Sequence, residues 1–236
     1  MADLNAGPPL GARWLALIAA SIAVGLYMDV AADLPGQIGA SVLAWGLLLY
    51  LLRSRLQQER GMLFSCLVIA TAGELFLSLV WGLYRYRLDN IPLFVPPDHA
   101  LLLILGLALA KALSERAALA VIGLAGAYTL GAALLEVDTF GLLLYALLVG
   151  CALWQPRRRR LFASTFVLAL ALELYGTWLG NWAWSSEVPW LGLVTTNPPL
   201  AAGAFYCALD MLVMIAAPVL RDAGVPVERA TRTASG

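Results

Sequence analysis

The chain has little charge and few residues of the kinds that bind metals. Only 13% of its 236 residues are charged and 61% are hydrophobic, and the mean hydropathy is +0.82. This balance excludes an ordinary water-soluble domain. One histidine and three cysteines without metal-ligand spacing, and the lack of a phosphate loop, haem motif or Ser-His-Asp order, predict no metal and no cofactor. We expect Cys66, Cys151 and Cys207 to be buried free thiols.

Long apolar runs replace the missing charge. They recur along the chain with lengths of about 17 to 24 residues, enough to cross a bilayer. We predict an all-α integral membrane bundle of about eight transmembrane helices. They cover residues 13–32, 36–52, 61–83, 97–113, 117–135, 139–154, 161–183 and 198–220. A single transmembrane domain (13–220) would then lie between an N-terminal cytoplasmic segment (1–12) and a polar cytoplasmic tail (221–236).

The basic residues indicate how the chain would lie in a membrane. The predicted outer loops contain only Arg85 and Arg87, so 13 of the 15 basic residues (15 − 2) fall on the other side. The positive-inside rule places that side and both termini in the cytoplasm. The alternation favours eight spans over seven, although the sixth run is short. We expect a bacterial inner (cell) membrane, with arginines 157–160 contacting lipid and no nucleic-acid partner.

Two segments repeat the same order of residues. Each has an acid, an aromatic-x-aromatic triplet, a proline and a double proline before a new apolar run. Glu74 and Glu173 open the two copies and lie 99 positions apart, the length of four predicted spans. Four spans restore the chain direction, so we predict two parallel four-helix repeats, about 13–113 and 117–220. At residue level the similarity is clear in 61–113 and 161–220.

Three acids are expected to meet in the interior as the catalytic residues. Glu74 and Glu173 would lie roughly 20 Å from cytoplasmic helix ends, and Asp210 roughly 17 Å from an outer end. Ionisable residues in hydrocarbon rarely face lipid and by default mark function. Because no Lys or Arg lies in the middle of a span, we expect these acids to be uncharged or to share protons.

Aromatic and polar side chains would complete the site. The predicted substrate-binding residues are Trp81, Tyr84, Tyr86, Trp178, Trp182, Trp184, Tyr206, His99 and Asn197. The outer aromatics equally suit an interfacial belt, and His99 is either a proton shuttle with Asp98 or an interfacial polar residue, which we favour. Asn197 is read as a helix cap. Gly176 and Gly180 either border a cavity or allow two helices to cross closely.

The second copy of the repeat resembles a known family. Its residues Glu173, Gly176, Gly180, Trp182 and Trp184 fit the pattern E-x-x-G-x-x-x-G-x-[YW]-x-[YW]. This pattern is similar to that of membrane carotenoid-biosynthesis proteins, which include bisanhydrobacterioruberin-type hydratases and are related to heterodimeric lycopene cyclases. The chain lacks the Pro-x-Glu-Glu motif of those cyclases, so cyclisation of lycopene is not expected. The first copy departs further from the pattern.

The intramembrane acids give a second resemblance. One Glu in an early span and one Asp in the last are similar to the acids of small membrane terpene cyclases of meroterpenoid and indole-terpenoid pathways. That resemblance implies that Glu74 and Asp210 fill those roles here.

An acid in an aromatic, apolar cavity suits one kind of chemistry. A neutral carboxyl group can donate a proton, and aromatic faces can stabilise the cation that results. We therefore expect an acid-catalysed cyclase, hydratase (lyase) or isomerase that acts on an isoprenoid, terpenoid or carotenoid-like lipid. The alternatives are a proton-coupled transporter and a non-catalytic membrane assembly partner. The sequence leaves the oligomeric state open.

Overall fold

The structure is a computed structural model that describes residues 10–54, 56 and 59–222. Over these residues the chain forms eight α-helices, so the all-α expectation fits. Their bounds are α1 Ala12–Ala31, α2 Asp33–Ser54, α3 Arg60–Glu74, α4 Val95–Ala112, α5 Glu115–Leu134, α6 Phe140–Trp154, α7 Arg159–Leu179 and α8 Gly203–Asp222. A π-helical turn, Leu75–Val80, continues α3. The expectations for residues 1–9 and 223–236 lie outside the described residues.

Six helical segments of the described chain are long and apolar enough to cross a membrane. They are α1, α2, α3 with its π-helical turn, α4, α5 and α7 with the short 3₁₀ turn before it, whereas α6 and the apolar stretch Gly203–Ala217 of α8 are shorter. Local sequence explains several helix starts. Ser114 accepts a hydrogen bond from the backbone N–H of Ala117 at the start of α5, and prolines occupy the first turn of α4, where their missing N–H costs nothing.

Two predicted helix ends are wrong. The predicted span 161–183 ends at Leu179, because Gly180 adopts a left-handed conformation with φ 88° and turns the chain out of the helix. The predicted span 198–220 begins only at Gly203. Pro198 and Pro199 lack backbone N–H groups and lie in the connection before α8. A Cβ at Gly203 would lie 2.8 Å from the Phe166 carbonyl oxygen, so this glycine lets α8 approach α7.

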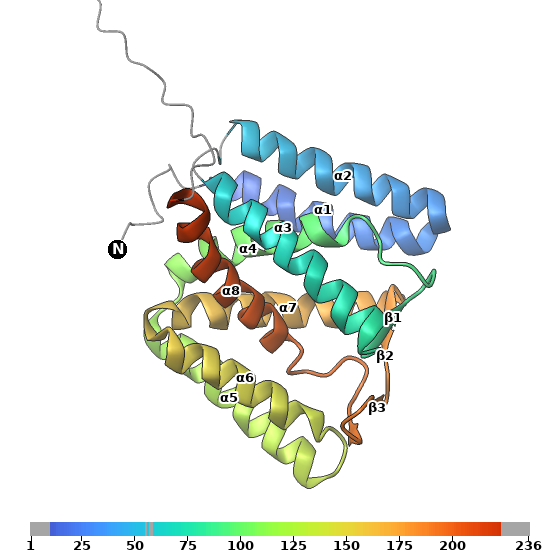
Figure 1. Cartoon of the computed structure of the whole chain (residues 1–236), viewed down its shortest axis with the longest axis vertical. Coiled ribbons are helices and arrows are strands. Elements are labelled where there is room, and N and C mark those ends of the chain that lie inside the picture. The colour runs from blue at the N-terminus through green and yellow to red at the C-terminus, as the bar shows by residue number, and fades with distance from the viewer. Residues whose placement is uncertain (1–9, 55, 57–58, 223–236) are drawn as a thin grey trace, which may run out of the picture.

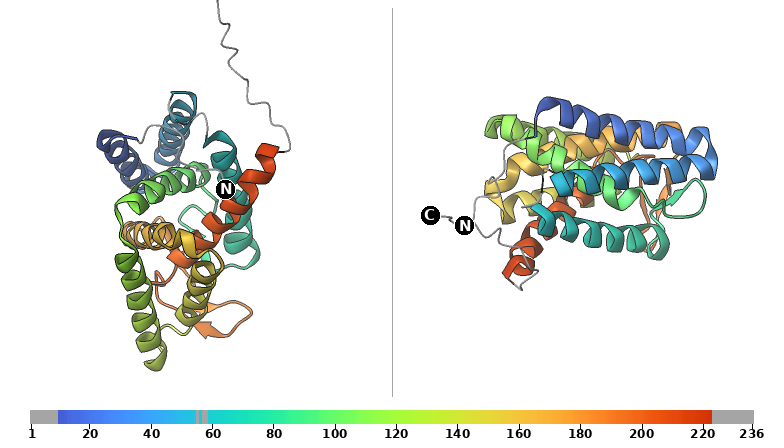
Figure 2. Two further views of the ribbon diagram at one scale, coloured as in Figure 1. Left: turned by 90° about the vertical axis from the view of Figure 1, so that its left-hand side faces the viewer. Right: turned by 90° about the horizontal axis from the view of Figure 1, so that it is seen from above.

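Four helices form the centre of the molecule. α3 packs against α8, and α4 packs against α7, while α3–α4 and α7–α8 are also paired. The hairpin α1–α2 covers α4 on one side, and the hairpin α5–α6 lies on the other side against α7 and α8 (Figures 1 and 2). The equivalence of α3–α4 with α7–α8 agrees with the part of the sequence in which similarity is clear. The two hairpins attach differently, so two complete four-helix repeats stay a prediction.

The two ends of the bundle differ. The arginine-containing turn Pro156–Arg158 between α6 and α7 lies at the same end as the start of α1 and the end of α8, while the strands lie at the opposite end (Figure 1). All three cysteines are buried and free, as expected.

A two-stranded ribbon joins the two repeat segments at the strand end. β1, Tyr84–Tyr86, pairs antiparallel with β2, Trp182–Trp184, so that Tyr84 lies opposite Trp184 and Tyr86 opposite Trp182. In both strands the outer residues are buried and the middle residue is exposed. Successive side chains of a strand point to opposite faces, so four aromatic rings share the inner face. A second small sheet, β3 Glu187–Val188 with β4 Leu193–Val194, follows.

Candidate active site

Glu74 lies at the end of α3, below the inner face of the ribbon. Its Oε2 accepts hydrogen bonds from the hydroxyls of Tyr84 at 2.8 Å and Tyr86 at 2.7 Å. Its Oε1 lies 3.0 Å from Nε2 of His99 on α4. The first aromatic-x-aromatic triplet therefore binds the acid of its own repeat segment.

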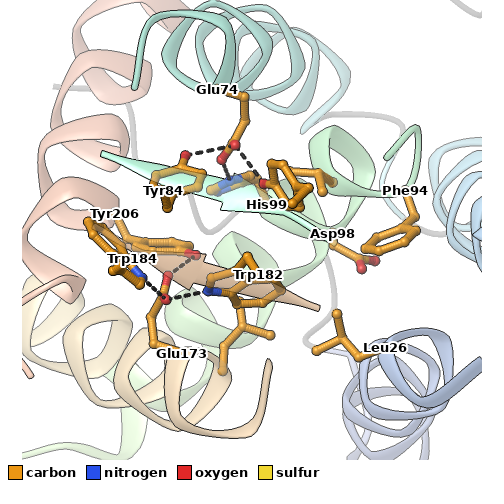
Figure 3. A pocket seen from close by; sticks show the side chains of 13 residues that line it. Leu26, Glu74, Tyr84, Phe94, Asp98, His99, Glu173, Trp182, Trp184 and Tyr206 are labelled. Atoms are coloured by element: carbon orange, nitrogen blue, oxygen red, sulfur yellow. Dashed lines mark hydrogen bonds and ion pairs between the residues drawn. The ribbon is translucent and has the colours of Figure 1, made fainter. Parts of the chain in front are cut away.

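Glu173 on α7 repeats this arrangement on the same inner face, with the rings of β2 in place of those of β1 (Figure 3). Its Oε2 accepts the indole N–H groups of Trp182 at 2.8 Å and Trp184 at 3.0 Å. Its Oε1 accepts the hydroxyl of Tyr206 on α8 at 3.0 Å. Each acid thus has three partners, two from its own triplet and one from the first turns of the helix that follows.

His99 and Tyr206 connect the two halves of the site. Their rings stack with centroids 4.9 Å apart and an interplanar angle of 29°. His99 therefore contacts Glu74 through its nitrogen and the partner of Glu173 through its ring. The interfacial interpretation that we favoured for His99 is wrong, because the helix start places it inside the site rather than at the rim.

The two glycines of the second copy have separate tasks, and neither serves a helix crossing. A Cβ at Gly176 would lie 2.1 Å from the indole of Trp182, so the glycine leaves room for that ring beside Glu173. Gly180 has open space around it, and its left-handed conformation reverses the chain into β2. The pattern therefore supplies an acid (Glu173), a glycine that leaves space for the Trp182 ring (Gly176), a turn (Gly180) and two indole donors.

The first copy contains one residue more between its acid and its turn. Gly82, also left-handed with φ 74°, follows Glu74 by 8 positions, whereas Gly180 follows Glu173 by 7. The π-helical turn Leu75–Val80 contains this additional residue, as expected for a helix that closes i→i+5 hydrogen bonds. The ribbon can then place both triplets over their acids despite the different spacing.

The π-helical turn also moves Trp81 away from the acid. Ordinary helical spacing placed it on the face of Glu74, and that prediction is wrong. The Trp81 indole donates to the carbonyl of Pro189 at 2.8 Å and stacks on Trp190, with ring centroids 5.9 Å apart. It supports the loop between β3 and β4 and lines neither of the two described cavities.

Two adjoining cavities border the acids. The smaller has about 40 Å³ and reaches Asp98, Tyr86, Trp182 and Phe94. The larger has about 180 Å³ and is walled mainly by apolar side chains of α3 and α8. The residues that line both are Glu74, Tyr84, His99, Glu173, Trp184 and Tyr206. Roughly 10–15 Å³ suffices for one water molecule, so the smaller cavity has room for a few.

The structure does not place Asp210 with the two glutamates. Asp210 is 2% exposed and accepts the hydroxyl of Thr165 on α7 at 2.7 Å, and it lines neither cavity. The physical reason is the late start of α8. Tyr206, one turn nearer the helix start, reaches Glu173, so Asp210 lies one turn deeper.

Two further predicted positions are wrong. Trp178 is 78% exposed and stacks on Tyr175 at the outside of α7. Five residues after Glu173 correspond to a rotation of about 140° at 3.6 residues per turn, so its ring points away from the acid. Asn197 does not cap a helix; its Oδ1 accepts the backbone N–H of Trp184 at 3.0 Å and thereby fixes the end of β2.

Sequence reasoning missed two features of this region. For Asp98 the sequence leaves helix capping and a proton shuttle with His99 open, but α4 begins earlier, at Val95, and Asp98 lines the smaller cavity. Asn181 was given no role, yet its amide donates to the Asp29 carboxylate at 2.7 Å and to the Leu26 carbonyl at 2.9 Å. This contact ties α1 to the ribbon. A buried acid in α1 was a signal for such a partner, since buried charges need hydrogen bonds.

The surroundings of the two β1 tyrosines keep their hydroxyls protonated. Burial, followed by the charge of Glu74, raises the pKa of Tyr84 and of Tyr86 well above the ordinary range, so both remain neutral donors. Of the described residues that line the smaller cavity, three are acids and only His99 can carry a positive charge. Unpaired charge is costly in such surroundings.

In the residues that the structure describes, no group of three or more His, Cys, Asp or Glu side chains is arranged to hold a metal ion. Comparisons of the chain with protein-family models, with curated proteins and with solved structures find no match.

Proposed function

We propose that this chain is an integral membrane enzyme that modifies an isoprenoid lipid by acid catalysis, through cyclisation, hydration or isomerisation. The observation that carries the proposal is the pair Glu74 and Glu173, each with three hydrogen-bond partners, at the border of an apolar cavity. The wall offers no charged groups to a polar substrate besides these acids and His99, which favours an apolar one. The resemblance to membrane carotenoid-biosynthesis proteins is in keeping with this reading.

Glu173 is proposed as the proton donor. His99 lies 3.0 Å from Glu74 and can balance the charge of that acid, which leaves Glu173 and Asp98 as the acids that carry protons. Glu173 is surrounded by two indole N–H groups and a tyrosine hydroxyl. Indole N–H groups only donate, so these partners stabilise the carboxylate that forms when Glu173 releases its proton. Donors aimed at a charge that develops during reaction are the arrangement that lowers a barrier.

The proposed step balances without a cofactor. The π electrons of a trisubstituted alkene take the Glu173 proton and form a C–H bond, which leaves a tertiary carbocation and the Glu173 carboxylate. A second alkene of the substrate can attack the cation and close a ring. Glu74 then takes the proton that the product loses. In hydration, water adds to the cation and Glu74 takes the surplus proton. Return of that proton to Glu173 closes the cycle.

Aromatic side chains would protect the cation. Tyr84 and Trp184 line both cavities, with ring centroids 4.8 Å apart. Their faces can stabilise positive charge. Asp210 has no part in this step, because it contacts neither cavity; we propose that its bond to Thr165 holds α8 against α7.

The membrane setting belongs to the same proposal. We place all eight helices across the membrane as two parallel repeats, with both termini in the cytoplasm of a bacterium and the ribbon at the outer end. The position of the arginine-containing turn Pro156–Arg158 at the end opposite the ribbon supports this orientation (Figure 1).

The test is product formation by the purified chain in lipid vesicles. Carotenoid and polyprenyl alkenes would be offered, and products separated and weighed: unchanged mass indicates cyclisation or isomerisation, and a gain of one water indicates hydration. We expect Glu173→Gln and Glu74→Gln to lower turnover at least 100-fold, and Glu136→Gln, an exposed loop acid, to leave it unchanged. Full activity of both site variants would exclude the mechanism. Proton flux under a pH gradient, in vesicles that contain the protein but no substrate, would favour the transporter instead.

A further inference from the structure

The larger cavity lies between two helices rather than at an end of the bundle. Its walls come from α3 and its π-helical turn on one side, with Ile69, Gly73 and Leu77, and from α8 on the other, with Leu209 and Leu212. The two helices pack against each other, and in Figure 1 they diverge toward the ribbon. The polar groups of Glu74, His99 and Glu173 line one part of this cavity.

The cavity reaches the outer surface of the bundle at an apolar face. Two of the residues that line it, Phe76 and Leu212, are 46% and 48% exposed, so they stand at its mouth. Around them on α3, the π-helical turn and α8, large apolar side chains are strongly exposed. They are Phe64, Val68, Leu75, Leu79, Val80 and Ile215. A face of this composition on a helix bundle faces lipid rather than water.

We propose that this mouth is a lateral entrance from the bilayer, through which one end of a linear unsaturated hydrocarbon reaches the two glutamates while the rest of the chain stays in lipid. The inference rests on the proposed function and adds the substrate class and its direction of entry. A chain end with no polar headgroup is the occupant that fits, because the mouth carries only apolar side chains.

The size of the cavity sets how much of the substrate enters. An apolar cavity of roughly 150 Å³ holds one benzene ring, so about 180 Å³ holds about one or two five-carbon units. A whole carotenoid or polyprenyl chain cannot fit. The reaction would therefore occur at a terminal double bond, and the length of the remaining chain would matter little.

Gly73 allows the entrance to be closed by a single substitution. It lines the cavity on the turn before Glu74, and a Cβ built on it meets nothing within 4 Å. The Cβ of Gly73→Leu would therefore meet no other atom, and the rest of its side chain would occupy the space between the mouth and Glu74. Gly131 on α5 is the matched control, since a Cβ there also meets open space and the residue lies outside both cavities. Leu212→Trp narrows the mouth from the α8 side and serves as a second variant.

The experiment uses a geranylgeranyl chain with a photoreactive diazirine at its terminal isoprene unit. The full chain in lipid vesicles is irradiated with the probe, and the labelled peptides are mapped by mass spectrometry. We expect labels on cavity-lining residues of α3, its π-helical turn and α8, namely Ile69, Leu77 and Leu209. Gly73→Leu and Leu212→Trp should lower this labelling at least ten-fold, and Gly131→Leu should leave it unchanged. A probe with the diazirine at the other end of the chain should label only the exposed apolar face.

The results separate this inference from the proposed function. Labelling of α3 and α8 that Gly73→Leu abolishes supports the entrance, even if no product is ever found. Labels elsewhere, or labelling that Gly73→Leu and Leu212→Trp leave intact, would overturn the proposed entrance. That holds even if Glu173→Gln abolishes product formation, a result that would support the acid mechanism alone. Failure of the acid mechanism alone would instead appear as normal labelling with full turnover in both glutamine variants.

Discussion

Replacing Gly176 by alanine tests the geometry around Glu173. The added Cβ would lie 2.1 Å from the Trp182 ring, and tight contacts begin at 3.4 Å, so the ring must retreat by 1.3 Å (3.4 − 2.1). Such overpacking costs about 1–3 kcal/mol. The hydrogen bond from Trp182 to Glu173, now 2.8 Å, would also lengthen beyond the usual range, at about 1 kcal/mol. We expect a total loss of roughly 2–4 kcal/mol and weaker stabilisation of the Glu173 carboxylate.

The measurement is thermal unfolding of the purified protein followed by tryptophan fluorescence, together with turnover. The midpoint should fall by roughly 5–15 °C, and the emission should shift as the Trp182 indole loses its partner. Gly180→Ala has open space but a left-handed backbone, so it should cost about 1–2 kcal/mol from strain. Gly131→Ala has neither problem and should cost nothing. If Gly176→Ala unfolds at the same temperature as Gly131→Ala, with unchanged emission, the Trp182 ring does not pack against Gly176.

Four further predictions follow from other contacts. Trp178→Leu should leave turnover unchanged, because the ring is 78% exposed; a large loss would show that it contacts substrate. Trp184→Phe removes one donor to Glu173 and should lower turnover about 10- to 100-fold in the assay above. Asn197→Ala leaves the backbone N–H of Trp184 without its partner and should lower the unfolding midpoint, at about 1–3 kcal/mol. Burial raises the pKa of the Asp138 carboxyl group, whose Oδ1 accepts the Gly141 N–H. The folded state therefore holds the carboxyl proton more tightly than the unfolded state, and stability falls as the pH rises above the ordinary Asp pKa of about 3.9. Asp138→Asn should be more stable than the unchanged protein in unfolding scans at neutral pH, but not at low pH.

Helix number and position could be predicted from the sequence because they depend on local properties. Apolar run length and the break at each polar connection define α1 to α7 to within a few residues. The start of α8 was missed because an apolar run continues through Pro198 and Pro199, and hydropathy does not register that prolines lack a donor. The repeat indicated that the two triplets have matching roles, but the pairing of the triplets as strands was not predicted and came only with the structure.

The site could be predicted only where the residues follow the repeat. Glu74, Glu173 and the four triplet aromatics lie together as predicted, because strand alternation brings a triplet's rings to one face. Trp81 and Asp210 depended on uninterrupted helical spacing, and a π-helical turn or a shifted helix start changes which face a residue occupies. Trp178 differs, because its place five residues after Glu173 on a regular helix itself turns the ring away from the acid. One inserted residue before Gly82 was visible in the sequence and could have indicated the π-helical turn.

The differences between the two copies say more about function than their likeness. If the acids only held helices together, equivalent partners on both sides would serve. Instead, Glu173 has two indole donors that cannot accept a proton beside the hydroxyl of Tyr206, whereas all three partners of Glu74, two hydroxyls and His99, can both give and accept one. One acid is therefore surrounded by groups that stabilise its anion, and the other by groups that can take a proton away. A reaction that begins and ends with proton transfer needs these two different environments, and a purely structural pair does not. Exchanging them tests the argument: Trp182→Tyr with Trp184→Tyr makes the partners of Glu173 like those of Glu74, and it should lower turnover more than either single change while the protein stays folded. Unchanged turnover would show that the asymmetry has no role in catalysis.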